Sequence, residues 1–346
     1  MKLRIEEYTL HFHQVARTSR STMANRKVWY FILEDKGKTG VGECALLPGL
    51  SPDNEQELKR QFQQLESDPD CCLRNDYELK KLPALKFAVE MALKDLKEGG
   101  RRLLFPSLFT NQVVPIKING LIWMGSYETM LRQIEEKLAE GWRCIKLKIG
   151  SLEFKTELKL LQQIRSRFNR DQLELRVDAN GAFTPGTVMD RLEHLAQFEL
   201  HSIEQPLQPG NWEFLAEICH QTPLPIALDE ELIACRDSHQ REVLLDRVRP
   251  HFLVLKPTLL GGFKDCEDWI KLAEERGIGW WITSALESNI GLNAIAQWTA
   301  TKKNLHYQGL GTGQLYSNNF PSPLRSVRGE LWYDQGSSWN LSALGL

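Results

Sequence analysis

Several features that define other protein classes are missing from this 346-residue sequence. No apolar run reaches the roughly 20 residues that a membrane-spanning helix needs. The residues that follow Met1 contain no apolar core of the kind found in secretion signals. No block of basic residues stands out, and the formal net charge is −2, which argues against binding to nucleic acid or to a membrane surface. We therefore expect neither a nucleic-acid partner nor a membrane partner.

Cysteine is scarce and lacks metal-binding spacing. The seven cysteines form no Cys-x-x-Cys pair, and the adjacent Cys71 and Cys72 do not have the spacing that zinc sites require. An odd number of scattered cysteines is typical of proteins whose thiols stay reduced. We therefore predict a cytoplasmic location.

The order of the expected elements changes near Val113. Before that point strands are followed by helices, an order that favours an α+β unit. The polar stretch at 18–26, between the first two strands, predicts a loop. After Val113 strands and helices alternate, beginning with a strand at 116–119 and ending with a glycine-rich strand at 308–312. Strict alternation is typical of a parallel (β/α) barrel.

Charged residues end five successive strands of this alternating region. In the strand at 144–150, Lys146 and Lys148 share one face because side chains alternate along a strand. The next four strands follow at intervals of about one strand–helix unit, roughly 30 residues. They end at Asp178, Glu204, Asp229 and Lys256. The active site of a parallel barrel is built at the C-terminal ends of its strands, so we expect these side chains to converge there.

Three converging carboxylates predict a metal site. Each acid has an ordinary interpretation by itself, such as a helix cap or a surface residue at a strand end. Three oxygen donors at regular intervals, with no nearby Cys or His, instead suit a hard cation, most simply Mg²⁺, with Mn²⁺ as the alternative. Such a cation would bind a substrate carboxylate and stabilise the enediolate formed when the α-proton leaves.

The flanking lysines are candidates for moving that proton. A free lysine has a pKa of about 10.4, and a base that is neutral at working pH needs a value about three units lower. Lys146 and the metal cation would both lower the pKa of Lys148. Lys256 is a second acid/base candidate or an electrostatic partner. The ordinary alternative for each lysine is a side chain that extends from a strand end to solvent.

Together these residues resemble the active site of the enolase superfamily, in its muconate-lactonizing-enzyme-like subgroup. A lysine base with a metal-stabilised enediolate is a known pattern of that superfamily. The resemblance rests on six residues: Lys146, Lys148, Asp178, Glu204, Asp229 and Lys256. It implies an α/β fold, a modified (β/α)₇β TIM-type barrel with an N-terminal α+β capping domain. The implied bounds are 1–112 for the capping domain, which a tail at about 321–346 completes, and 113–320 for the catalytic barrel.

Three further stretches resemble the o-succinylbenzoate synthases of that subgroup. Residues 16–20 are similar to a flexible substrate-covering loop, 42–51 to a capping-domain turn, and 309–315 to an eighth-strand motif. The resemblance implies metal-dependent syn dehydration of 2-succinyl-6-hydroxy-2,4-cyclohexadiene-1-carboxylate to o-succinylbenzoate, a step towards menaquinone. The implied partner is therefore a small carboxylate substrate.

The same resemblance implies roles for individual residues. Lys148 takes the α-proton and then protonates the departing hydroxide, while Lys256 faces the ring as a cation. Lys146 keeps the pKa of Lys148 low and helps to hold the carboxylate. The implied substrate contacts are Asn180, Ser284, Gly311, Thr312 and Arg20. For the glycines a tight barrel closure is the alternative, and for Arg20 a solvated side chain.

Two departures from the synthase pattern leave alternatives open. Ala285 stands where a second serine is common, and Glu230 and Glu231 follow Asp229, where a small residue is common at the second position. On a strand, Glu230 would point to the face opposite Asp229. An N-acylamino acid racemase would exchange protons between lysines on both sides of one α-carbon. A dipeptide epimerase usually carries Asp-x-Asp where this chain has Gly-Leu-Gly at 309–311. A muconate-type cycloisomerase and a non-catalytic metal-binding barrel are further alternatives, and the oligomeric state stays open.

Overall fold

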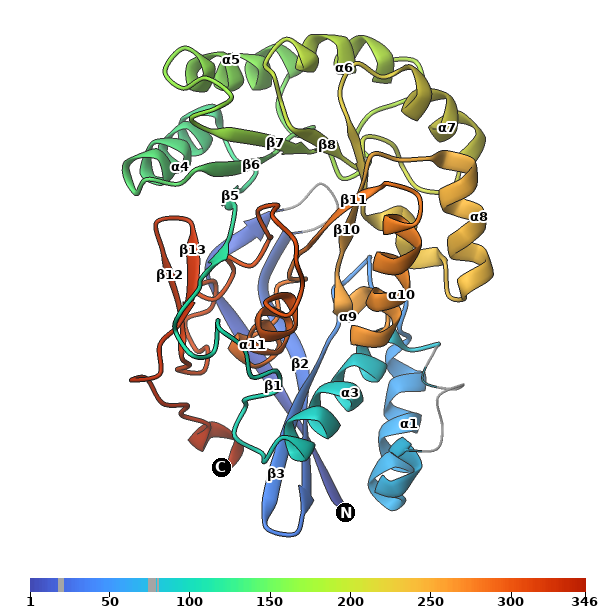
Figure 1. Ribbon diagram of the computed structural model, residues 1–346, viewed down its shortest axis with the longest axis vertical. Helices are drawn as coiled ribbons and strands as arrows, with labels where there is room; N and C mark the ends of the chain where they lie inside the picture. Colours follow the sequence, from blue (N-terminus) through green and yellow to red (C-terminus); the bar gives the residue numbers. More distant parts are fainter. Residues whose placement is uncertain (18–21, 74–78, 80) are drawn as a thin grey trace.

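A computed structural model of the chain describes residues 1–17, 22–73, 79 and 81–346. The N-terminal part contains an antiparallel sheet in the order β1–β2–β3 (Figure 1). Its strands are β1 (Lys2–Arg17), β2 (Thr22–Asp35) and β3 (Lys38–Ala45). The central strand is covered on both faces: Trp29 and Phe31 pack in the core formed with helices α1 (Glu55–Ser67) and α3 (Pro83–Lys97), while Tyr30 belongs to the main core. This sheet therefore joins the two cores.

The two helices that cover this sheet begin at side-chain caps. Asn54 accepts hydrogen bonds from the backbone N–H groups of Gln56 and Glu57 at the start of α1. At the start of α3, Asp53 Oδ1 accepts from Ala84 N at 3.0 Å and Leu85 N at 3.5 Å. Asp53 Oδ2 is buried and has no hydrogen-bond partner among the described residues. Burial raises the pKa of the Asp53 carboxyl to about 7, because the charged form loses hydration.

This raised pKa predicts a pH-dependent contribution to stability. The folded protein holds the Asp53 proton to higher pH than the unfolded chain does, so the contribution is present below about pH 4 and is lost as the pH rises through about 7. The loss amounts to about 4 kcal/mol at most. Asp53→Asn keeps the Oδ1 cap and removes the titration. We expect chemical denaturation to show the variant gaining stability relative to wild type between pH 4 and pH 8; an equal difference at both pH values would contradict this account.

In the part of the chain that the structure describes, seven parallel strands form one sheet in chain order. They are β5 (Gly120–Ile122), β6 (Cys144–Lys148), β7 (Glu174–Asp178), β8 (Ser202–Glu204), β9 (Ile226–Leu228), β10 (Phe252–Leu255) and β11 (Gly279–Ile282). The helices that follow these strands along the chain are α4 (Tyr127–Ala139), α5 (Phe154–Arg165), α6 (Val188–Ala196), α7 (Trp212–Gln221), α8 (Ser238–Val248), α9 (Pro257–Leu260), α10 (Gly262–Glu274) and α11 (Asn289–Thr299). Figure 1 shows α4 to α8 along the outer side of the curled sheet.

The sheet closes through a short eighth segment. Gln308 makes a parallel bridge to Ile118, and Gly309 makes one to Thr283 beyond β11. Gln308 N donates to Lys117 O at 2.9 Å, and Gly309 N donates to Ile282 O at 2.8 Å. The glycine-rich strand expected at 308–312 is thus reduced to isolated bridges that connect the two edges. The predicted α/β fold, with a curled parallel barrel and an N-terminal antiparallel sheet, is confirmed.

The first barrel strand lies a few residues after the predicted position. The strand expected at 116–119 supplies β4 (Ile116–Lys117), which pairs antiparallel with β13 (Glu330–Tyr333). The strand that pairs with β6 is β5, a few residues later. Both stretches are short, and alternation alone does not say which partner each one takes. β13 also pairs with β12 (Leu324–Val327).

The C-terminal tail returns to the N-terminal strand. Arg4 Nη2 donates to Leu344 O at 2.8 Å, and Tyr8 Oη donates to Asn318 O at 3.2 Å. The division into units at 1–112 and 113–320 stays a prediction.

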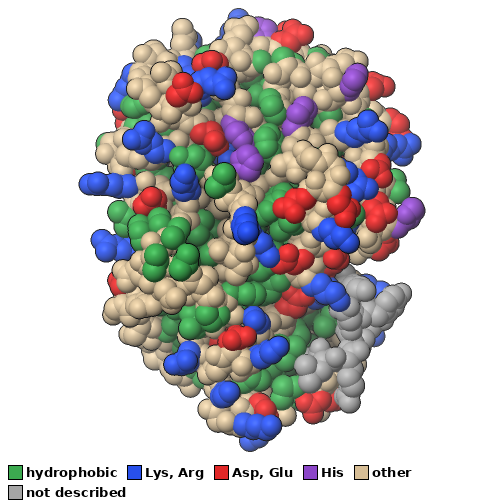
Figure 2. All heavy atoms as spheres, viewed as in Figure 1, with side chains coloured by type: hydrophobic (Ala, Val, Ile, Leu, Met, Phe, Trp, Pro, Cys, Tyr) green, Lys and Arg blue, Asp and Glu red, His purple; other side chains and the backbone are tan. Residues whose placement is uncertain are grey.

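On the face drawn in Figure 2, acidic and basic side chains are interspersed. No helix in the described residues has the length and apolar character needed to cross a bilayer.

Candidate active site

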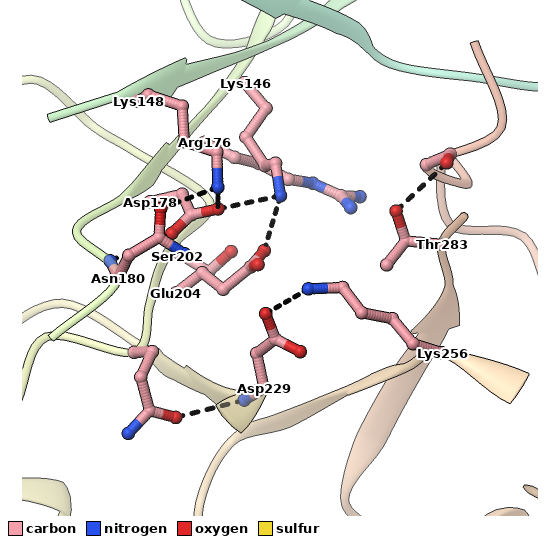
Figure 3. Close-up of polar contacts among 12 residues, drawn as sticks. Lys146, Lys148, Arg176, Asp178, Asn180, Ser202, Glu204, Asp229, Lys256 and Thr283 are labelled. Carbon is pink, nitrogen blue, oxygen red and sulfur yellow. Dashed lines mark hydrogen bonds and ion pairs between the residues drawn. The ribbon is translucent and has the colours of Figure 1, made fainter. Parts of the chain in front are cut away.

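The parallel register places the predicted charges side by side. Lys148 lies opposite Asp178 in the pairing of β6 with β7, and Asp178 lies opposite Glu204 in the pairing of β7 with β8. Asp229 and Lys256 each come directly after the last residue of a strand, β9 and β10. Each of these side chains is buried or nearly so. The structure therefore brings together the six residues on which the predicted site rests (Figure 3).

Lysines approach the carboxylates from two sides. Lys146 Nζ donates to Asp178 Oδ2 at 3.1 Å and to Glu204 Oε2 at 2.8 Å. Lys148 Nζ donates to the same Asp178 oxygen at 2.5 Å. Lys256 reaches in from the opposite side in Figure 3 and donates to Asp229 Oδ2. The three acids thus lie between ammonium groups, as charges buried this deeply require.

These contacts shift the pKa values in opposite directions. Burial alone would raise the pKa of Asp178, but the ammonium groups of Lys148 and Lys146 hold it well below its usual range. Burial raises the pKa of Glu204 to about 7, and the nearby Asp178 charge adds to the effect. Burial alone would lower the pKa of Lys146, but Glu204 and Asp178 raise it above the ordinary lysine value. Charge compensation therefore outweighs desolvation at two of these three groups.

The donor set fits a divalent cation. Glu204 Oε1 is buried without a hydrogen-bond partner in the described ranges, and three carboxylates end neighbouring strands. No group of three or more acidic, histidine or cysteine side chains in those ranges already has the arrangement of an ion site. The reason is geometric: oxygens of all three acids accept from lysines in this structure. Carboxylate oxygens are the ligands that Mg²⁺ prefers.

A pocket opens above this cluster. Its charged lining consists of Lys146, Lys148, Glu230 and Lys256. Its apolar lining is supplied partly by the N-terminal region, through Met23, Leu47, Pro48 and Leu50, and partly by Leu121, Trp123 and Leu286. A small ring or chain with a carboxylate at one end matches this division.

The structure places four of the five weaker predicted contacts at the pocket, and their contact with substrate stays a prediction. Asn180 lines the pocket, accepts from Lys148 Nζ at 2.7 Å through Oδ1 and donates to Glu230 at 3.0 Å through Nδ2. Gly311 also lines the pocket. Ser284 and Thr312 line it too, but Thr312 Oγ1 donates to Ser284 Oγ at 2.9 Å, so these hydroxyls are engaged with each other. Arg20 lies outside the described residues.

Two expectations about charged residues were wrong. Glu230 does not point away from the site: β9 ends at Leu228, and the 3₁₀ helix η2 (Glu230–Ala234) turns Glu230 into the pocket lining. Arg26 is not part of a polar loop but lies within β2 and is buried. Sequence pattern gave no sign of either position, because both depend on where a strand starts or stops. The apolar pocket residues were missed because nothing in the sequence separates them from core residues.

The six cysteines whose side chains the structure describes are buried free thiols: Cys44, Cys71, Cys144, Cys219, Cys235 and Cys266. Burial raises the pKa of the Cys144 thiol, which is therefore protonated and unreactive at neutral pH. The cytoplasmic location stays a prediction.

Comparisons with known proteins agree on one family. A family model described as enolase C-terminal domain-like matches residues 129–337. An o-succinylbenzoate synthase from Desulfotalea psychrophila is 47% identical over 356 residues, which cover 94% of this chain and 96% of the relative. The crystal structure of MenC from Desulfotalea psychrophila superposes with a TM-score of 0.85 at 45% identity, covering 96% of this chain and 99% of that one. The o-succinylbenzoate synthase from Thermosynechococcus elongatus, complexed with magnesium in its active site, has a TM-score of 0.75 at 25% identity, with 92% and 95% covered.

Proposed function

The chain belongs to the enolase superfamily, among its o-succinylbenzoate synthases, and from this membership we propose that the site dehydrates 2-succinyl-6-hydroxy-2,4-cyclohexadiene-1-carboxylate to o-succinylbenzoate. The observation that carries the proposal is the 47% identity to a synthase along nearly the whole of both chains. The pocket agrees in chemistry, since lysines line one side and apolar side chains the other. The reaction is a step towards menaquinone.

The proposed metal ligands are Asp178, Glu204 and Asp229. A divalent cation held there, most simply Mg²⁺ with Mn²⁺ as the alternative, supplies Lewis-acid stabilisation of the substrate carboxylate as its α-proton leaves. The magnesium in the Thermosynechococcus relative supports this assignment. The buried Glu204 oxygen that lacks a partner in the described residues supports it independently.

The proposed proton carrier is Lys148. Its Nζ takes the α-proton and returns it to the departing hydroxyl group on the same face, which gives a syn elimination. Asn180 orients the lysine through the 2.7 Å hydrogen bond to its Oδ1. Lys256 approaches from the opposite side (Figure 3) and places a cation against the ring as it becomes aromatic. Lys146 helps to hold the carboxylate end.

Product analysis tests this proposal. Purified protein with Mg²⁺ is incubated with the hydroxycyclohexadiene carboxylate, and the products are followed by proton NMR. We expect the aromatic signals of o-succinylbenzoate to replace the diene signals. In parallel, N-succinylamino acids are incubated in D₂O to measure α-proton exchange. Exchange without any aromatic product would contradict the dehydration proposal and favour the racemase alternative, in which Lys148 and Lys256 act on both faces of one carbon.

A further inference from the structure

The segment between β11 and α11 forms one wall of the pocket. Thr283, Ser284, Ala285 and Leu286 all line it. Leu286 has a φ of +64°, in the left-handed region that costs energy for a branched side chain. A strained backbone persists only where its surroundings hold it. The contacts that hold this wall therefore decide its shape.

One buried guanidinium connects this wall to the N-terminal sheet. Arg26 Nη1 donates to Ala285 O at 2.5 Å and also to Leu286 O. Its Nη2 donates to Ala45 O at 2.8 Å, and its Nε donates to Leu46 O at 2.9 Å. Leu46 leads directly into Leu47 and Pro48, which line the pocket from the other side. Arg26 therefore fixes the spacing of two pocket walls that are far apart in sequence.

A buried carboxylate makes a second connection between the N-terminal sheet and the chain that follows the wall. Glu43, in β3, accepts from Ser288 N at 2.8 Å, from Ser288 Oγ at 2.6 Å and from Gly291 N at 2.8 Å. These donors form the first turn of α11, so Glu43 holds the helix that follows the wall.

A second carboxylate, that of Glu287, forms hydrogen bonds within the wall segment itself. Glu287 accepts from Ser284 Oγ at 2.7 Å and from Ala285 N at 2.8 Å. The Ser284 hydroxyl proton is thereby used inside the protein, and this side chain helps to hold the wall.

We propose that Arg26 and Glu43 are positioning residues, which clamp the segment at 284–288 against the N-terminal sheet so that Ala285 and Leu286 form a rigid wall that fits the substrate. The proposal rests on the proposed dehydration and extends it to residues that touch neither substrate nor metal. Within the described residues, the hydrogen bonds of Arg26 and Glu43 go to the wall, to α11 and to the N-terminal sheet, and none goes to the lysines or carboxylates at the strand ends. The clamp should therefore govern binding far more than the chemical step.

Arg26→Lys tests the clamp. Lysine keeps the charge, but its single ammonium cannot reach four carbonyl groups on two segments. We expect the Kd for o-succinylbenzoate, measured by calorimetry with saturating Mg²⁺, and the KM for dehydration each to rise at least about tenfold, because buried hydrogen bonds from a charged group are lost. We expect kcat to fall less than about threefold, since proton transfer by Lys148 is untouched. Glu43→Gln should act in the same direction, because the NH₂ group of the amide cannot accept, so the hydrogen bonds at one of the two carboxylate oxygens are lost.

The controls separate this role from a general effect on folding. Arg167→Lys changes an exposed ion pair with Glu135 and should leave Kd, KM and kcat unchanged. Thermal melting is measured for each variant, and if Arg26→Lys does not fold, Glu43→Gln carries the same test. A folded clamp variant with unchanged Kd and KM would overturn the proposal, as would one that loses kcat alone. A wild-type protein that neither binds o-succinylbenzoate nor forms it would contradict the proposed function itself, which distinguishes the two failures.

Discussion

Replacing Lys148 by alanine is expected to lower kcat for dehydration by about 10²- to 10⁴-fold, the usual contribution of a positioned acid or base. Lys148 is buried at the end of β6, where its Nζ contacts Asp178 and Asn180. Steady-state kinetics with saturating Mg²⁺ would measure the loss.

Metal binding should survive this substitution. Removing the ammonium takes away one of the two lysine donors to Asp178 Oδ2, which Lys146 still contacts at 3.1 Å. We therefore expect Mg²⁺ affinity in Lys148→Ala, measured by calorimetric titration, to be unchanged or higher. Lys155→Ala, at an exposed position in α5, is the matched control and should behave as wild type. Near-normal turnover in Lys148→Ala would remove this lysine as the base.

Replacing Glu204 by glutamine is expected to weaken Mg²⁺ binding and to lower kcat by about 10²- to 10³-fold, because a poorly held cation stabilises the developing negative charge less. The amide keeps the shape of the side chain but removes the negative charge that a hard cation prefers. Burial already raises the pKa of Glu204 to about 7, so the neutral amide should be well tolerated in the metal-free protein. Titration with Mg²⁺ and thermal melting without metal would measure the two effects separately.

Glu231→Gln is the matched control for Glu204→Gln. Glu231 is also buried, but it accepts from Gly210 N at 3.0 Å and from Trp212 Nε1 at 2.7 Å, away from the lysines. We expect this variant to lose stability while its Mg²⁺ affinity stays at the wild-type value. Unchanged Mg²⁺ affinity in Glu204→Gln would exclude Glu204 from the ligand set.

The strand-end charges were predictable because a parallel barrel imposes a regular repeat. Lys148, Asp178 and Glu204 fall at the ends of neighbouring strands, and the pairing register then sets them side by side. No partner needs to be known for that inference, since every parallel strand ends at the same rim. The family resemblance added the expected reaction, and the comparisons support it.

Other parts of the site depend on contacts that local pattern does not encode. Glu43 meets Ser288 across 245 positions of sequence, and only the folded chain reveals that pair. The direction of Glu230 depends on β9 ending at Leu228, and strand ends are where sequence patterns are weakest. The same limit displaced the first barrel strand from 116–119 to β5. The resemblance implies Ser284 as a substrate contact, which stays a prediction; only the fold shows that its hydroxyl donates to Glu287.

The most direct test of metal-dependent dehydration is an absorbance assay with the purified protein. The hydroxycyclohexadiene carboxylate is added with Mg²⁺, and the loss of diene absorption is followed before and after addition of a chelator. The account predicts rapid loss that stops with chelator and resumes when Mg²⁺ is restored. No loss with Mg²⁺ present, or loss that continues unchanged in excess chelator, would contradict it.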